Sequence, residues 1–265
     1  MVPAHDEREL LPACLAAIAV ATAEVAPLPV ERIVVADACT DDTASLAAAA
    51  GATVLTIGAR NVGAARAAGM AHALRHGPDG LWLATTDADS LVSPGWLRWQ
   101  LRRAATGADL LAGTVEVDDW TAWPAGLPAA YEQRYRAGVT SRSHRHVHGA
   151  NLGLTAHAYL AAGGFAARRY DEDRDLISRA LAAGARVVAD PGCPVRTSSR
   201  PHGRAPNGFA AHLSSLAAEA IGAGGSPLAA EAISAGGSRL AAEAIGAGGG
   251  SLAARAIGTE TVGIG

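Results

Sequence analysis

Apolar and polar residues alternate in short blocks between residues 31 and 190, and the block lengths match those of strands and helices. The apolar runs predict strands over 33–36, 53–57, 81–85 and 110–117. The segments between them predict helices over 40–50 and 61–75, and a helix that begins at Pro94, since proline favours the first helical turn. This alternation is typical of an α/β domain in which helices flank a mostly parallel sheet.

The two ends of the chain depart from this pattern. Val2-Pro3-Ala4 has the character of the last step of a strand whose beginning is absent. We therefore expect a truncated first strand, explained either by a misassigned start codon or by real truncation. At the other end, near-copies of LAAEAIGAGG recur at a period of twelve residues, beginning at Leu216, Leu228, Leu240 and Leu252.

Each repeat holds only about two helical turns, which is too short for a stable isolated helix in water. It also has only one Leu and one Ile to bury. The sequence therefore predicts a folded domain over residues 1–205 and a low-complexity, Ala- and Gly-rich, poorly ordered tail over residues 206–265.

Charge and cysteine content narrow the classes of function. All 22 basic residues are Arg and the formal net charge is -3, so we expect no nucleic-acid partner. Cys14, Cys39 and Cys193 form no CxxC pair, which favours reduced thiols over a zinc site or disulfides. No apolar run reaches the ~18 residues of a membrane span, and the acidic start differs from a signal peptide. We expect a cytoplasmic protein without a transmembrane segment; peripheral membrane contact stays open.

Acidic residues follow two of the predicted strands, at the sheet edge where ligands of α/β proteins bind. Asp87 and Asp89 lie two residues apart after an apolar strand. Such a pair can hold a hard divalent cation together with phosphate oxygens, or it can serve only as an Asx turn or helix cap. Asp37 ends the strand predicted over 33–36 and can accept a hydrogen bond from a ribose hydroxyl or a base N–H.

Further candidates lie at predicted helix starts and in a histidine-rich stretch. Arg66 can meet a phosphate or pair with a carboxylate of the site, or it can be an ordinary surface arginine. Glu172 and Asp173 begin a helix, where acids also suit the helix dipole. His144, His146 and His148 would share one face of a strand, which fits either a metal site or a stretch that faces solvent or a cleft.

Taken together, these elements resemble the family 2 glycosyltransferases over about residues 2–200. The opening Val2-Pro3-Ala4-His5-Asp6-Glu7 resembles I-P-A-x-N-E, with Asp6 in place of Asn. Residues 34–43 resemble V-V-D-x-S-T-D-D-T, with Cys39 in place of Ser, and residues 61–69 resemble N-x-G-x-A-x-A-R-N-x-G. Residues 86–89 resemble the D-x-D element, 149–151 with 163–165 resemble G-x-N and G-G-F, and 172–176 resemble E-D-x-D-L.

The resemblance implies a GT-A fold, a bound Mg²⁺ or Mn²⁺ ion, and transfer of a sugar from a UDP- or GDP-linked donor to an acceptor hydroxyl. The resemblance also implies that Asp87 and Asp89 bind the metal and that Asp173 and Glu172 are the catalytic acids. It assigns donor binding to Pro3, Ala4, Glu7, Asp37, Arg66 and Asp87.

The expected mechanism is a single displacement with inversion, in which a carboxylate takes the proton of the acceptor hydroxyl. Asp173 lies three and four residues before Leu176 and Ile177 on the buried helix face, so we expect it to face the cleft. Glu172, about 100° away around the helix, is expected to cap the helix or to meet an arginine. Two alternatives stay open: a nucleotidyltransferase of related fold, and a truncated nucleotide-binding protein without turnover.

Overall fold

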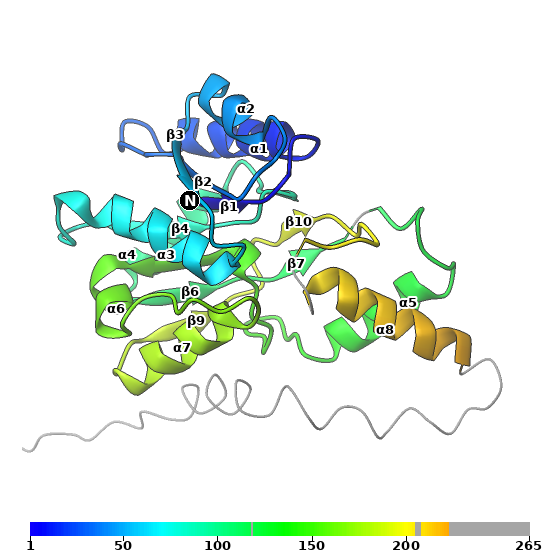
Figure 1. The fold of residues 1–265 in the computed structure, drawn as a ribbon. Helices are drawn as coiled ribbons and strands as arrows, with labels where there is room; N and C mark the ends of the chain where they lie inside the picture. The colour runs from blue at the N-terminus through cyan, green and yellow to red at the C-terminus, as the bar shows by residue number, and fades with distance from the viewer. Residues whose placement is uncertain (118, 205–207, 223–265) are drawn as a thin grey trace, which may run out of the picture.

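The computed structural model describes residues 1–117, 119–204 and 208–222 (Figure 1). A parallel sheet contains β1 (Val2–Ala4), β2 (Ile33–Asp37) and β3 (Thr53–Ile57), in the order β1-β2-β3. Every residue of β2 is buried, because this strand lies between two others and has apolar residues packed on both faces. The apolar runs that predicted β2 and β3 therefore correspond to real strands.

A second sheet continues the first. It contains β4 (Trp82–Thr85), β6 (Leu110–Ala112), β8 (Leu152–Thr155) and β9 (Val187–Ala189), in the order β4-β8-β6-β9. Met1 joins the two sheets: its amino group donates to the Ala84 carbonyl at 2.7 Å, and its carbonyl accepts from the Thr86 N–H at 3.3 Å. These two bonds follow the pattern of a parallel pair, so β1 lies beside β4.

Strand β8 runs antiparallel to both of its neighbours, whereas β6 and β9 are parallel. A third, smaller sheet contains β5 (Ser90–Leu91), β7 (Val115–Glu116) and β10 (Val195–Thr197), in the order β5-β10-β7. The single strand predicted over 110–117 is thus divided between β6 and β7. The division occurs because residues 113 and 114 bond to Asn151 instead of to a neighbouring strand. The Gly113 N–H donates to the Asn151 carbonyl at 2.8 Å, and the Asn151 side-chain amide donates to the Thr114 carbonyl at 2.9 Å.

Helices cover both faces of the joined sheets. Apolar residues of β6 point alternately to the two sides, with Leu111 in one core cluster and Leu110 and Ala112 in the other. The first cluster contains α1 (Leu11–Ala23), α2 (Thr43–Ala49) and α4 (Trp96–Ala105). The second contains α3 (Val62–Ala73), α6 (Ala156–Ala161) and α7 (Glu172–Ala182). Two short 3₁₀ helices, Leu74–His76 and Gly149–Asn151, follow α3 and precede β8.

The helix starts show local capping. Asn61 is the N-cap of α3, and its side chain accepts the Ala64 N–H at 2.9 Å, as a capping residue should. Helix α4 begins at Trp96 rather than at Pro94, because the Trp96 N–H still closes a turn onto the Ser93 carbonyl at 3.0 Å.

Helices α5 (Leu127–Arg136) and α8 (Phe209–Gly222) pack against each other beside the small sheet (Figure 1). Leu213 and Leu216 of α8 are buried against Leu127 and Tyr131 of α5. Helix α8 includes the beginning of the first repeat, so residues 209–222 of the expected tail have a packed partner. Residues 223–265 lie outside the described part of the chain, and for them the tail stays a prediction.

Across the ranges described above, none of the helices has both the length and the apolar character that crossing a membrane requires.

Candidate functional site

The carboxyl ends of β1, β2 and β4 open into one cavity of about 810 Å³. Its wall continues through the residues before and at the start of α7, the segment 146–150, and parts of α5 and α8. The nine site residues that the resemblance assigned all line this cavity, namely Pro3, Ala4, Glu7, Asp37, Arg66, Asp87, Asp89, Glu172 and Asp173. The structure therefore brings together groups that lie up to 170 positions apart in the chain.

Arg66 links the acids on the floor of the cavity. Its guanidinium donates to Asp87 at 2.6 Å, to Glu172 at 3.0 Å and to the hydroxyl of Thr85. Only 2% of the Arg66 side chain is exposed, so it is a buried cation rather than a surface arginine. Burial alone would lower the pKa of Arg66, but the surrounding carboxylates of Asp87, Glu172 and Asp173 raise it. Its charge is therefore permanent, and it fixes the orientation of both partner acids.

Gly149 leaves room for this guanidinium. A Cβ atom built on Gly149 would lie 2.3 Å from an Arg66 terminal nitrogen, well inside contact distance. Any side chain at position 149 would therefore displace Arg66 from Asp87. The G-x-N stretch noted in the sequence thus contributes to the site through its glycine.

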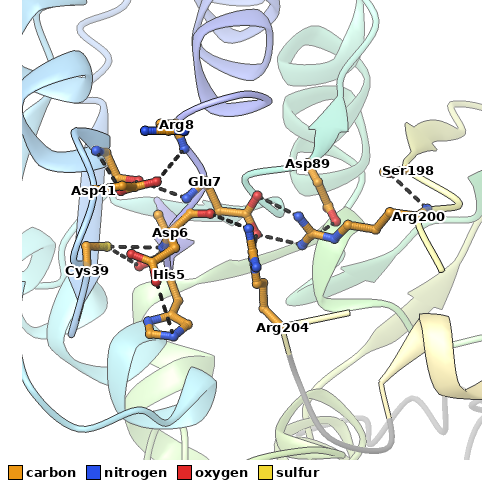
Figure 2. A network of polar contacts seen from close by, with 12 residues as sticks. His5, Asp6, Glu7, Arg8, Cys39, Asp41, Asp89, Ser198, Arg200 and Arg204 are labelled. Carbon is orange, nitrogen blue, oxygen red and sulfur yellow. Dashed lines mark hydrogen bonds and ion pairs between the residues drawn. The ribbon is translucent and has the colours of Figure 1, made fainter. Parts of the chain in front are cut away.

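Asp89 and Glu7 share a second arginine, Arg200, which lies just after β10 (Figure 2). The Arg200 guanidinium donates to both oxygens of Glu7 at 2.7 and 2.6 Å, and lies 2.9 Å from an Asp89 oxygen. Burial raises the pKa of Asp89 to about 7, with Arg200 opposing and the acids Asp87 and Glu7 adding to the rise. Arg200 could not be identified from the sequence, because no motif marks it and 193 positions separate it from Glu7.

Asp37 has a structural role that the sequence did not predict. One of its carboxylate oxygens accepts the backbone N–H groups of Ala59 and Arg60 at 2.7 and 2.8 Å, and the other accepts that of Asn61 at 2.7 Å. The carboxylate therefore holds the loop between β3 and α3 in place. Each oxygen can accept more than one hydrogen bond, so a role toward a nucleotide stays a prediction.

Asp173 and Glu172 have separate partners at the start of α7. Glu172 is buried and bonded to Arg66, in agreement with the expectation that it meets an arginine. Asp173 accepts the Gly149 N–H and the Arg174 N–H, both at 2.7 Å. Burial and the neighbouring Glu172 raise the pKa of Asp173 to about 6, while Arg66 acts in the opposite direction.

The three histidines lie near one another but do not form a metal site. The rings of His144 and His146 are 6.2 Å apart, and those of His146 and His148 are 6.0 Å apart. His144 is buried and bonded to the Ala112 carbonyl at 2.9 Å, whereas His146 and His148 line the cavity beside Tyr135. Two of the three histidines, His146 and His148, therefore face the cavity.

His148 is held as a neutral ring. The Tyr135 hydroxyl oxygen accepts the Val115 N–H at 2.9 Å, so its own proton is free for the His148 Nε2 at 3.0 Å. Burial, and to a smaller extent the nearby histidines and Arg174, lower the pKa of His148 to about 3. His148 therefore presents an uncharged imidazole beside Asp173.

Two groups of residues are candidates for binding a cation. Within the described residues, Asp6, Cys39 and Asp41 form a group of three with ligand atoms within 4.8 Å of one another. Their carboxylates already serve local turns, since Asp6 accepts the Thr40 N–H at 2.6 Å and Asp41 accepts the Thr43 N–H at 2.9 Å.

Asp87 and Asp89 fit a divalent cation better. They offer hard oxygen ligands inside the cavity, where a bound phosphate and water can complete the coordination, as Mg²⁺ sites usually require. Asp87 is 37% exposed and only one of its oxygens is bonded to Arg66. Asp89 is already balanced by the cationic Arg200, which shows that positive charge is accommodated there.

Comparison with known proteins adds a family and a fold. The family model described as Glycosyl transferase family 2 matches residues 1–172. No curated protein sequence matches the chain. The fold is similar to that of the mannosyltransferase PcManGT from Pyrobaculum calidifontis in complex with GDP-Man and Mn²⁺, with 19% identity and a TM-score of 0.56, over 93% of this chain and 77% of that one.

Two further structures are similar. TarS 1-349 of S. aureus in complex with UDP has 14% identity and a TM-score of 0.54, over 84% of this chain and 70% of that one. Glucosyl-3-phosphoglycerate synthase from Mycobacterium tuberculosis, in complex with Mn²⁺, UDP and glucosyl-3-phosphoglycerate, has 19% identity and a TM-score of 0.50, over 83% of this chain and 75% of that one. At identities this low, these likenesses show a shared fold.

Proposed function

Because the chain belongs to glycosyl transferase family 2, we propose that it transfers a sugar from a UDP- or GDP-linked donor to an acceptor hydroxyl with inversion. The observation that carries the proposal is the single cavity, which contains the Asp87–Asp89 pair, the end of β2 and the start of α7. A donor bound to the Asp87–Asp89 pair and to the end of β2 would place its sugar in the same cavity as Asp173. The similar structures that contain GDP-Man or UDP support this choice of donors.

Asp87 and Asp89 would hold Mg²⁺ or Mn²⁺, which would stabilise the negative charge that develops on the leaving diphosphate. Arg66 engages one oxygen of Asp87, and the other oxygen would serve as a ligand of the metal. Pro3, Ala4, Glu7 and Asp37 would form the donor side of the wall. The family relatives PcManGT and the mycobacterial synthase were both solved with Mn²⁺, which supports this assignment.

Asp173 is the group that we assign as the base. It would accept the proton of the acceptor hydroxyl as that oxygen attacks the sugar carbon. A pKa near 6 leaves Asp173 ionised at neutral pH and makes it a stronger base than an ordinary aspartate. Glu172 is less suited, because it is buried and its carboxylate is engaged by Arg66.

Calorimetric titration with UDP and GDP tests the donor site. We expect one of the two to bind in the presence of Mn²⁺, and to bind at least about tenfold more weakly in EDTA or in the Asp89→Ala variant. The matched control is Asp79→Ala, since Asp79 is 95% exposed and precedes β4 instead of following it. Equal affinity in EDTA, or in Asp89→Ala, would remove the metal from the proposal.

A further inference from the structure

Arg200 lines the cavity but has no role in the proposed mechanism as described so far. It donates from two nitrogens to the two oxygens of Glu7, so the pair has the fork geometry in which arginine binds carboxylates most strongly. One of these nitrogens also lies 2.9 Å from Asp89. Figure 2 shows the guanidinium between the two acids, with Arg204 beside it.

The Arg200 guanidinium compensates charge that burial makes costly. The side chains of Glu7 and Asp89 are 6% and 16% exposed, and an unpaired carboxylate in such a place is strongly disfavoured. With a divalent cation on Asp89, that carboxylate no longer needs Arg200. The cation and the guanidinium would then also repel each other at short range.

The two partners of Arg200 differ in strength. Glu7 accepts two hydrogen bonds and is the more deeply buried acid, whereas Asp89 has a single contact with Arg200. Arg200 is therefore more easily separated from Asp89 than from Glu7. Its backbone stays close in either case, because the Ser198 N–H donates to the Asp89 carbonyl at 3.2 Å and the Arg200 N–H donates to the Ser198 hydroxyl at 3.2 Å.

We propose that Arg200 is an exchangeable counter-ion of Asp89 and a binding residue for the donor diphosphate. Without a metal it pairs with Asp89; when the metal and the nucleotide diphosphate enter, it releases Asp89, stays anchored on Glu7, and donates the freed N–H to a diphosphate oxygen. This inference rests on the proposed function, and it assigns to Arg200 a role in coupling the entry of metal and donor.

The exchange predicts two effects of opposite sign in Arg200→Gln. Without nucleotide, Mn²⁺ should bind roughly three- to tenfold more tightly, because it no longer competes with a guanidinium for Asp89. With Mn²⁺ saturating, UDP or GDP should bind about tenfold or more weakly, because a charge-assisted hydrogen bond to the diphosphate is lost. A residue with only a structural role would not move these affinities in opposite directions.

Free Mn²⁺ is measured by its electron paramagnetic resonance signal, and nucleotide affinity by titration of UDP and of GDP at saturating Mn²⁺. The matched control is Arg204→Gln, which removes the same charge from the same segment. Arg204 donates to the Asp6 carbonyl at 2.7 Å and lies 3.9 Å from Glu7, and the structure shows no contact between it and Asp89. Its Mn²⁺ affinity should stay within about twofold of the natural chain.

The exchange is supported if Arg200→Gln binds Mn²⁺ more tightly and the nucleotide diphosphate more weakly than the natural chain, and if Arg204→Gln shows neither change. Unchanged or weaker Mn²⁺ binding in Arg200→Gln, or an equal gain in Arg204→Gln, overturns it, even where the natural chain binds metal and nucleotide as proposed. If the natural chain binds neither, the proposed function falls and this inference with it.

Arg200→Lys is a second variant that tests the exchange even if Arg200→Gln fails to fold. Lysine keeps a charge for Glu7, but its single ammonium lacks the fork that spans two carboxylates. It should therefore also bind Mn²⁺ more tightly than the natural chain, while its thermal unfolding midpoint stays close to the natural one. Natural Mn²⁺ affinity in a folded Arg200→Lys protein would contradict the exchange.

Discussion

At the scale of single residues, the acids of the cavity differ mainly in their partners. Asp37 is bound by three backbone N–H groups, Asp87 by the buried Arg66, and Asp173 by two backbone N–H groups. Their common location could be predicted from the sequence, because each follows a strand or begins a helix at the same sheet edge. Their partners could not, since these depend on where distant segments meet.

The proposed base should give a pH-dependent rate. Because Asp173 must be ionised to accept a proton and its pKa is raised to about 6, kcat/KM at saturating metal should increase with pH through about 6 and level off above 7. Asp173→Asn should reduce turnover about 10²-fold or more and abolish this increase, with donor affinity little changed. Steady-state rates between pH 5 and 8 measure both effects.

Asp175→Asn is the matched control, because Asp175 lies on the same helix but pairs with Arg168 and Arg179. It should retain most of the turnover. Near-natural turnover in a folded Asp173→Asn protein would transfer the role of base to another group, with Glu172 the first candidate.

Asn151 shows how a sequence motif can have a structural role. Its amide donates to the carbonyls of Thr114 and Cys193 at 2.9 Å each and accepts the Trp96 indole N–H at 2.9 Å, all of them buried. Asn151→Ala leaves these partners unsatisfied and should cost about 3 kcal/mol or more of unfolding free energy. Urea unfolding measures this loss. Asn61→Ala, which removes a helix cap and one exposed hydrogen bond to the Ala167 carbonyl at 3.2 Å, should cost about 1 kcal/mol; an equal loss in both would contradict this role.

At the scale of elements, the sequence predicted the strands β2, β3 and β4 and the helix α3 closely, because their apolar runs are bounded by clear caps and turns. The GT-A arrangement that the resemblance implied is confirmed. The reversed strand β8 was missed, since Leu152-Gly153-Leu154-Thr155 is too short to give a pattern of its own. The division between β6 and β7 depends on Asn151, which lies far along the chain.

Helix α8 was assigned to the tail because its sequence resembles the repeats that follow it. The repeat pattern did not show that Leu213 and Leu216 have a partner surface on α5. We propose that the folded domain extends to residue 222 instead of residue 205.

Two truncations test this boundary. A chain of residues 1–222 should unfold at the same temperature as the whole chain, because the remaining repeats have little to bury. A chain of residues 1–206 should be clearly less stable, since it exposes Leu127 and Tyr131. Leu213→Ala in the whole chain should cost about 2–5 kcal/mol for the same reason. Equal unfolding temperatures of the two truncations would restore the boundary at residue 205.

At the scale of the whole molecule, the cavity lies between two kinds of wall. The sheet edge and the start of α3 supply Asp37, Asp87, Asp89 and the buried Arg66, whereas α5, α8 and residues 146–148 supply aromatic and imidazole groups. The proposed donor binds to the first wall, so the second is left to face the acceptor. The position of Asp173 beside His148 and Gly149 places the proposed base where the two walls meet.

The central claim, metal-dependent sugar transfer in this cavity, is tested most directly by a screen of UDP- and GDP-sugars that measures released UDP or GDP with Mg²⁺ or Mn²⁺ present. We predict that one class of donor releases its nucleotide with metal. Release should stop in EDTA and in Asp89→Ala, and persist in Asp79→Ala. Nucleotide release that is unaffected by EDTA and by Asp89→Ala, or no release from any donor in a protein shown to be folded, would contradict the account.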